Sequence, residues 1–250
     1  MVKQLYFIIA IFFLIVSCQQ SSQTQNPHAE GFDIANSDAK AIALADEVMA
    51  AMGGRENWDK TRFISWVFFG KRKIFWDKWS GDVKVKALDK DLQIIVNLNT
   101  GGGRVWKDST ELSHPDSLAK YLELGKKIWV NDSYWLIMPY KLKDSGVRLK
   151  YLKEDKNKDG NDSDVIELTF KQVGYTPNNK YNVWIDKKTK LVNQWAFYEE
   201  ANDTTALFID TWKDYQKFGN ILLSASRGDN QLTEIEVLDK APDDWFTFSK

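Results

Sequence analysis

The sequence predicts a mainly β (α+β) fold, in which a strongly curved antiparallel sheet is covered by two or three helices. Two observations predict this class. From residue 61 onward, short segments rich in β-branched and aromatic residues alternate with tight-turn residues, which is typical of antiparallel meanders and not of βαβ units. Amphipathic segments precede this region and return in its middle, where we expect them to cover the sheet.

The first helix is expected over residues 37–52. Ser37 is a good N-cap residue, apolar side chains then recur at steps of three and four, and the pair Gly53-Gly54 ends the pattern. This segment therefore has one apolar face, which needs a sheet or another helix to cover it.

A second helical region is expected over residues 115–137. Pro115 suits a first helical turn, whereas Gly125 is expected to break the helix. Asn131 is then expected to cap a separate short helix, which Pro139 ends. This region should place two helices between two groups of strands.

The expected strands are short and number about ten to twelve in total. They are residues 62–69, 73–79, 83–87, 92–97 and 104–107 before the second helical region, and 147–152, 165–170, 181–186, 191–198, 207–215, 221–225 and 232–237 after it. No repeat and no internal linker separates these segments, so residues 36–250 are expected to form a single domain.

Residues 1–17 have the features of a bacterial lipoprotein signal peptide. Lys3 is basic, and the apolar run 5–16 is shorter than the about 20 residues that cross a membrane. The run ends at Cys18, and small or apolar residues before a cysteine resemble the lipobox, whose cysteine becomes the lipidated first residue. The alternative is an ordinary secretory signal. Residues 18–35 are expected to form the lipidated cysteine and a polar, flexible tether.

Aromatic residues make up 14% of the chain and include 11 Trp, many of them in expected strands. Both faces of the strands around residues 61–70 and 191–198 are apolar, so both should be covered. One interpretation is an ordinary core, and the other is an apolar pocket on the concave face of the sheet. The candidate pocket residues are Trp66, Phe68, Trp135, Trp184, Trp195 and Phe197.

Four segments resemble the outer-membrane lipoprotein-sorting superfamily of Lol carrier and receptor proteins, and more closely an uncharacterised group of bacteroidete lipoproteins. They are ALADEVMAAMGG (43–54), TRFISWVFFG (61–70), NDSYWLIMPYKLKDSG (131–146) and KYNVWIDKKTKLVNQWAF (180–197). The resemblance implies a Lol-carrier-like domain, an unclosed β-barrel with a lid of helices that holds acyl chains inside. It also implies a place in the cell envelope, on the outer membrane and facing the periplasm.

Most catalytic chemistry is not expected. Lys and Arg total 34 against 35 Asp and Glu, so nucleic acid is not an expected partner. With Cys18 lipidated and His28 in the tether, His114 is the one histidine of the domain, too few for a His/Cys zinc site. The glycines at 101–103 are not followed by the Lys and Ser or Thr of a phosphate loop. We predict no metal and no other cofactor.

The acidic segment from Asp155 to Asp164 partly matches a calcium loop, but Ile166 stands where a bidentate Glu is required. A solvated turn is the main interpretation, and weak calcium binding is the alternative. The sequence thus predicts a lipid-anchored envelope protein that binds an acyl chain, a lipid or a lipoprotein segment and is not an enzyme. Two alternatives stay open: an interaction module with a filled core, and a hydrolase that uses carboxylates alone.

Overall fold

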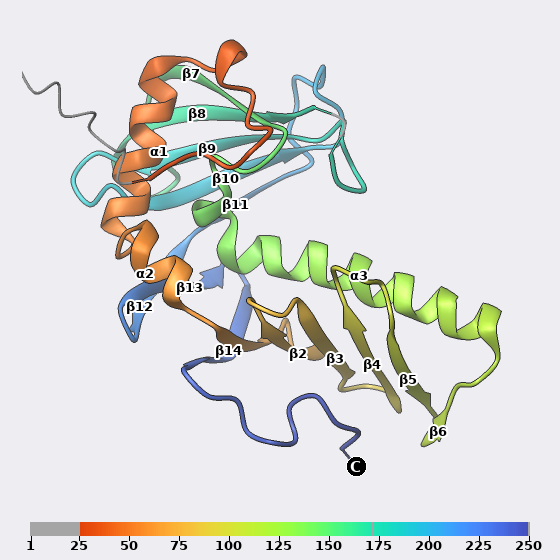
Figure 1. The fold of residues 1–250 in the computed structure, drawn as a ribbon. Helices are drawn as coiled ribbons and strands as arrows, with labels where there is room; N and C mark the ends of the chain where they lie inside the picture. The colour runs from red at the N-terminus through yellow and green to blue at the C-terminus, as the bar shows by residue number, and fades with distance from the viewer. Residues whose placement is uncertain (1–25, 172, 250) are drawn as a thin grey trace, which may run out of the picture.

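The computed structural model describes residues 26–171 and 173–249, so the predicted signal peptide and Cys18 lie outside the described residues. The strands form two antiparallel sheets (Figure 1). The nine-stranded sheet has the order β12-β13-β14-β1-β2-β3-β4-β5-β6, and the five-stranded sheet has the order β11-β10-β9-β8-β7. The expected mainly β, unclosed fold with covering helices is confirmed, with its strands divided between two sheets.

The strands of the nine-stranded sheet are β1 (Phe63–Phe68), β2 (Arg72–Asp77), β3 (Asp82–Ala87), β4 (Leu92–Asn97), β5 (Gly103–Lys107), β6 (Thr110–Glu111), β12 (Lys213–Phe218), β13 (Ile221–Arg227) and β14 (Asn230–Leu238). Strands β1 to β6 form a meander, and β14 pairs antiparallel with β1. The last strands of the chain therefore extend the sheet that the first strands begin. The strands of the five-stranded sheet are β7 (Val147–Lys156), β8 (Asp162–Phe170), β9 (Lys180–Asp186), β10 (Val192–Tyr198) and β11 (Phe208–Thr211).

Three α-helices and two short 3-10 helices complete the described fold: α1 (Ala39–Ala51), α2 (Arg55–Lys60), α3 (Pro115–Ile137), η1 (Ile34–Asn36) and η2 (Met138–Lys141). Helix α3 lies across β3, β4 and β5, whereas α1 packs on β7 and η2 (Figure 1). The first helix and the start at Pro115 agree with the sequence prediction. Helix α2 was not predicted, because six residues are too few to show a periodic pattern.

The predicted break of α3 at Gly125 is wrong, as is the separate helix capped by Asn131, because α3 is one continuous helix of 23 residues. Gly125 is buried against β4, and a Cβ placed there would lie 2.6 Å from Cγ2 of Ile94. The missing side chain lets the helix approach the sheet closely. Glycine in a helix interior costs about 1 kcal/mol of stability, and packing of the flanking helical turns on the sheet offsets this cost.

The strand predicted over residues 207–215 is two strands that belong to different sheets. Strand β11 pairs with β10, β12 pairs with β13, and Trp212 lies between them. Trp212 is 2% exposed, and its backbone N–H donates to the carbonyl of Asn193 at 2.9 Å. A bend at this residue passes the chain from one sheet to the other, as at the corners of packed sheets.

The segment after β14 covers the face of the nine-stranded sheet opposite α3, as its dark blue trace shows in Figure 1. The Trp245 ring lies 6.1 Å from the Phe63 ring and 5.1 Å from the Phe75 ring. Nζ of Lys84, a side chain that this segment buries, donates to the Thr247 carbonyl at 2.6 Å. A sheet with apolar residues on both faces is thus covered on both sides, by α3 and by the chain's own end.

Candidate functional site

A cavity of about 530 Å³ lies between the C-terminal half of α3 and the five-stranded sheet. This volume is within the range of small-molecule pockets. The apolar and aromatic residues that line it are Trp129, Val130, Tyr134, Trp135, Val147, Phe170, Val173, Tyr175, Tyr181 and Phe197. The charged side chains in its described lining come from α3 and the segment after it: Lys127, Lys141 and Asp144.

One wall of the cavity is built by the hairpin of β9 and β10. Tyr181 and Phe197 are directly paired across the two strands, and their ring centroids are 5.2 Å apart. The opposite wall is α3, from which the Tyr134 ring approaches that of Tyr181 to 5.3 Å. The cavity therefore exists only where the helix meets the sheet.

A layer of tryptophans lies behind this lining. Trp195, which is 1% exposed, stacks on Tyr181 at 5.2 Å and meets Trp135 edge-on at 4.8 Å. Trp212 contacts the other edge of Trp195 at 5.4 Å. Large rings in edge and stacked contacts lock one another's rotamers, so this wall is rigid.

A buried arginine holds the end of α3 against this layer. The Arg227 guanidinium lies 3.3 Å from the ring centroid of Trp212, and it donates to the carbonyl of Trp135 through Nε at 3.0 Å. Burial lowers the pKa of Arg227 to about 9. Because its donors are used on backbone carbonyls and Ser224, this cation stabilises the helix end and does not face the cavity.

Tyr134 lines the cavity, but its hydroxyl oxygen is itself buried and has no hydrogen-bond partner among the described residues. Burial raises the pKa of Tyr134 well above its ordinary value, so the phenol is neutral. An unsatisfied buried hydroxyl costs about 1–3 kcal/mol.

Two of the residues predicted from the sequence line the cavity, Trp135 and Phe197. Trp195 lies directly behind them. Phe68 contacts the edge of Trp135 at 6.4 Å from the neighbouring sheet, so it supports the lining from outside. Trp66 is fully buried in the main core, away from the cavity.

Trp184 lies on the other face of the five-stranded sheet. It packs with Val165 and Ala196 in a small cluster separate from the main core. Side chains alternate along β9, so Tyr181 and Val183 point to the core side while Trp184 points outward. A register shift between Val192 and Gln194 interrupts the alternation along β10, so Val192 and Trp195 both lie on the core side.

The segment 155–164 contains the hairpin turn between β7 and β8 and the strand ends that flank it. Its carboxylates pair with lysines, Asp162 with Lys156 at 2.7 Å and Asp159 with Lys213 at 2.8 Å. Within residues 26–171 and 173–249, no three His, Cys, Asp or Glu side chains gather in a way that could hold a metal ion. His114 is exposed directly before α3.

Sequence reasoning did not select Tyr134, Phe170 or Tyr181. A partial signal exists for Tyr181, because the segments 180–186 and 192–198 are joined by a short turn that pairs them. The register shift between Val192 and Gln194 then decides that its partner is Phe197. Tyr134 and Phe170 have no such signal. They meet only because α3 packs on this sheet, with ring centroids 6.4 Å apart.

No family model matches the sequence, and no curated protein matches it either. Among solved structures, a DUF1329 family protein from Desulfovibrio piger is similar. It is 14% identical, with a TM-score of 0.43, and the match covers 82% of this chain and 96% of that chain. A similarity at this level assigns neither family nor function, so the resemblance to the lipoprotein-sorting superfamily stays a prediction.

Proposed function

We propose that this protein is a lipid-anchored envelope lipoprotein that binds the apolar part of an acyl chain, a lipid or a lipoprotein segment between α3 and the five-stranded sheet. The observation that supports this proposal is the cavity of about 530 Å³ with its aromatic lining. An interaction module with a filled core has no need of such a space, so the cavity favours ligand binding.

The lining fits an apolar chain. Tyr134, Trp135, Phe170, Tyr181 and Phe197 are only half-buried, so a ligand in the cavity would remove their rings from water. Each CH₂ group that becomes buried contributes about 0.8 kcal/mol.

The charges around the cavity argue against a carboxylate hydrolase. Asp144 is the one carboxylate among the described lining residues, and it pairs with Lys141. A pair of carboxylates is what such hydrolysis requires. We therefore propose a binding protein and not an enzyme.

Lipidation at Cys18 would keep the protein at one membrane, because stable acyl anchoring prevents free diffusion. Among the helices that the structure describes, none is long and apolar enough to span a bilayer. We therefore propose that the protein receives or holds its ligand in place, on the outer membrane and facing the periplasm. Recovery of the mature protein mainly in the soluble periplasmic fraction of intact cells would contradict this.

The decisive experiment is native mass spectrometry of a soluble form that lacks residues 1–18, followed by lipid extraction. We expect an adduct with the mass of one lipid or acyl chain, and its loss when Phe197→Ala is introduced. Trp184→Ala is the matched control, since this side chain lies on the opposite face of the same sheet. A protein that carries no adduct and binds no acyl probe in titration would refute the proposal.

A further inference from the structure

Trp79, in the turn between β2 and β3, is 59% exposed. Trp66, Trp195 and Trp212, by contrast, are each at most 2% exposed. Single exposed apolar side chains are common on protein surfaces, so exposure alone has no meaning.

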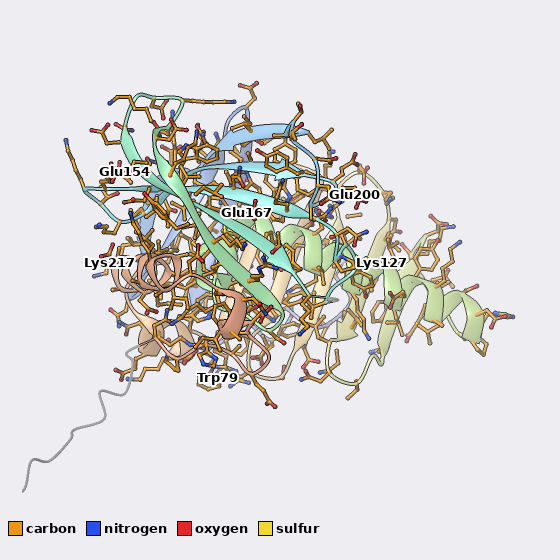
Figure 2. All side chains as sticks on the ribbon, turned by 90° about the horizontal axis from the view of Figure 1, so that it is seen from above. Trp79, Lys127, Glu154, Glu167, Glu200 and Lys217 are labelled. Atoms are coloured by element: carbon orange, nitrogen blue, oxygen red, sulfur yellow. The ribbon has the colours of Figure 1, made fainter. Side chains whose placement is uncertain are left out.

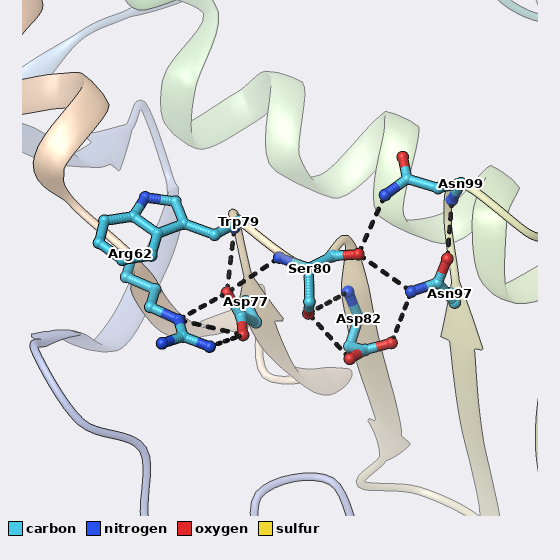
Figure 3. A network of polar contacts seen from close by, with 7 residues as sticks. All are labelled: Arg62, Asp77, Trp79, Ser80, Asp82, Asn97 and Asn99. Atoms are coloured by element: carbon cyan, nitrogen blue, oxygen red, sulfur yellow. Dashed lines mark hydrogen bonds and ion pairs between the residues drawn. The ribbon is translucent and has the colours of Figure 1, made fainter.

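The turn that presents Trp79 is held rigidly (Figure 3). The Asp77 carboxylate accepts hydrogen bonds from the backbone N–H groups of Trp79 at 3.0 Å and Ser80 at 3.3 Å. It also accepts one from the Arg62 guanidinium at 2.9 Å, and the same guanidinium lies 5.1 Å from the Trp79 ring centroid. The turn thus presents a large apolar ring to solvent in one fixed position.

The Trp79 indole is also bound to helix α2. Its Nε1–H donates to the carbonyl of Asp59 at 3.1 Å. From the other side, Arg55 binds the Asp59 carboxylate at 2.8 Å and reaches the carbonyl of Pro27 at 3.5 Å. One short helix therefore connects Trp79 to the point where the described chain begins.

The position of Asn26 limits how a protein anchored through Cys18 can be oriented on a membrane. The predicted lipid attachment at Cys18 precedes Asn26 by eight residues. Even a fully extended chain of this length spans at most about 29 Å. A membrane that holds the acyl chains of Cys18 must therefore lie within this distance of Asn26, and α2 is among the first surfaces it can touch.

We propose that α2 and the β2–β3 turn form the membrane-facing surface of the anchored protein, with the Trp79 ring in the interfacial layer of the bilayer. Tryptophan is enriched at this depth, because its ring is apolar and its N–H is polar. Lys60, on the same helix, is exposed and pairs with Glu56, so the charge of this surface is balanced. The inference rests on lipidation at Cys18 but not on any ligand in the cavity.

The test uses the full lipidated protein, reconstituted in vesicles of phosphatidylethanolamine and phosphatidylglycerol that contain nitroxide-labelled lipids. With Cys18 acylated, the mature chain has no other cysteine, so an engineered cysteine carries the fluorophore alone. We place it at Lys60→Cys on α2 or at Glu200→Cys, which Figure 2 shows far from Trp79. We expect the nitroxide-labelled lipids to quench the fluorophore several-fold more strongly at position 60 than at position 200.

A second variant distinguishes the contribution of the Trp79 ring from the effect of the lipid anchor alone. Trp79→Ala should lower the quenching at position 60 severalfold, whereas Leu207→Ala, which removes a side chain that is 61% exposed elsewhere, should leave it unchanged. Equal quenching at positions 60 and 200, or quenching insensitive to Trp79→Ala, overturns the inference and favours a protein partner for this surface. Lipid co-purification with the soluble form does not depend on Trp79, so a failure of the proposed cavity function is recognised separately.

Discussion

Tyr181 and Phe197 lie directly opposite each other on β9 and β10, and both rings face the same cavity. The short turn between these strands and the register shift between Val192 and Gln194 together set this pairing, so features within one hairpin build one wall. The other wall is Tyr134 on α3, 47 positions earlier in the sequence than Tyr181 (181 minus 134). The cavity thus depends on both local pairing and long-range packing.

We expect Phe197→Ala and Trp66→Ala to have different effects. Phe197 lines the cavity, so Phe197→Ala should lower the free energy of unfolding only slightly. The same substitution should weaken the binding of an apolar fluorescent probe severalfold. Trp66 is fully buried, and its truncation should lower the free energy of unfolding by about 3–5 kcal/mol. Denaturant unfolding and probe titration of both variants check this. Equal stability losses, together with a parent protein that binds no probe, would favour the filled-core module.

Tyr134→Phe removes a hydroxyl that is buried without a partner. The stability of the empty protein should therefore stay unchanged or rise by about 1 kcal/mol, because the variant buries no unsatisfied group. Denaturant unfolding of the parent and the variant measures this. A loss of stability of more than about 1 kcal/mol would show that the hydroxyl has a hydrogen-bond partner in the folded protein.

Cys18→Ala should abolish membrane anchoring. The apolar run that ends in Ile-Val-Ser-Cys predicts lipobox processing, and Cys18 is the only cysteine that could be acylated. Labelled palmitate should be incorporated into the parent protein only, and the variant should not fractionate as a lipid-anchored protein. Equal incorporation into both proteins would show that Cys18 is not the lipidation site.

The ion pair between Arg72 on β2 and Asp132 on α3 should be important for docking the helix. Nε of Arg72 lies 2.5 Å from Oδ2 of Asp132, and the carboxylate is fully buried. Arg72→Met leaves that charge without its partner, so we expect a loss of about 3–5 kcal/mol in the free energy of unfolding. Arg104→Met, which breaks the exposed pair with Glu111, is the control and should cost at most about 1 kcal/mol.

If Arg72→Met is no more destabilising than Arg104→Met, the buried pair does not dock the helix. A second substitution tests the cause. Adding Asp132→Asn to Arg72→Met should recover part of the lost stability, because it removes the unpaired buried charge.

Stability should fall in alkali. Burial raises the pKa values of Tyr134, Tyr140, Tyr181 and Tyr215 above the ordinary 10.0. The folded state therefore keeps phenolic protons that the unfolded state releases near pH 10, so this contribution to stability is complete below that pH and is lost above it. Tyrosinate absorbance should increase together with the loss of far-UV circular dichroism. Ionisation of these tyrosines in a fully folded protein would contradict the prediction.

The sequence alone predicts the elements whose signal is local. The strand over 92–97 has the predicted limits, and the helix begins at Pro115 as expected. Alternation of side chains and the geometry of proline act within a few residues, so they can be interpreted without a tertiary structure.

Other features depend on what each residue packs against. Gly125 continues a helix because Ile94 lies against it, and the bend at Trp212 passes the chain between sheets. Trp195 and Trp184 both lie inside strands with similar sequence patterns, yet Trp195 lies behind the cavity and Trp184 lies on the opposite face of the sheet.

The sequence by itself determined the mainly β class and the covering helices. The tertiary structure alone decided that the strands form two sheets, that the chain's end covers one of them, and that a cavity lies under α3. The physical reason is the range of the interactions involved. Propensity and periodicity act over a few positions, whereas a cavity is the space left where side chains distant in sequence fail to fill a contact.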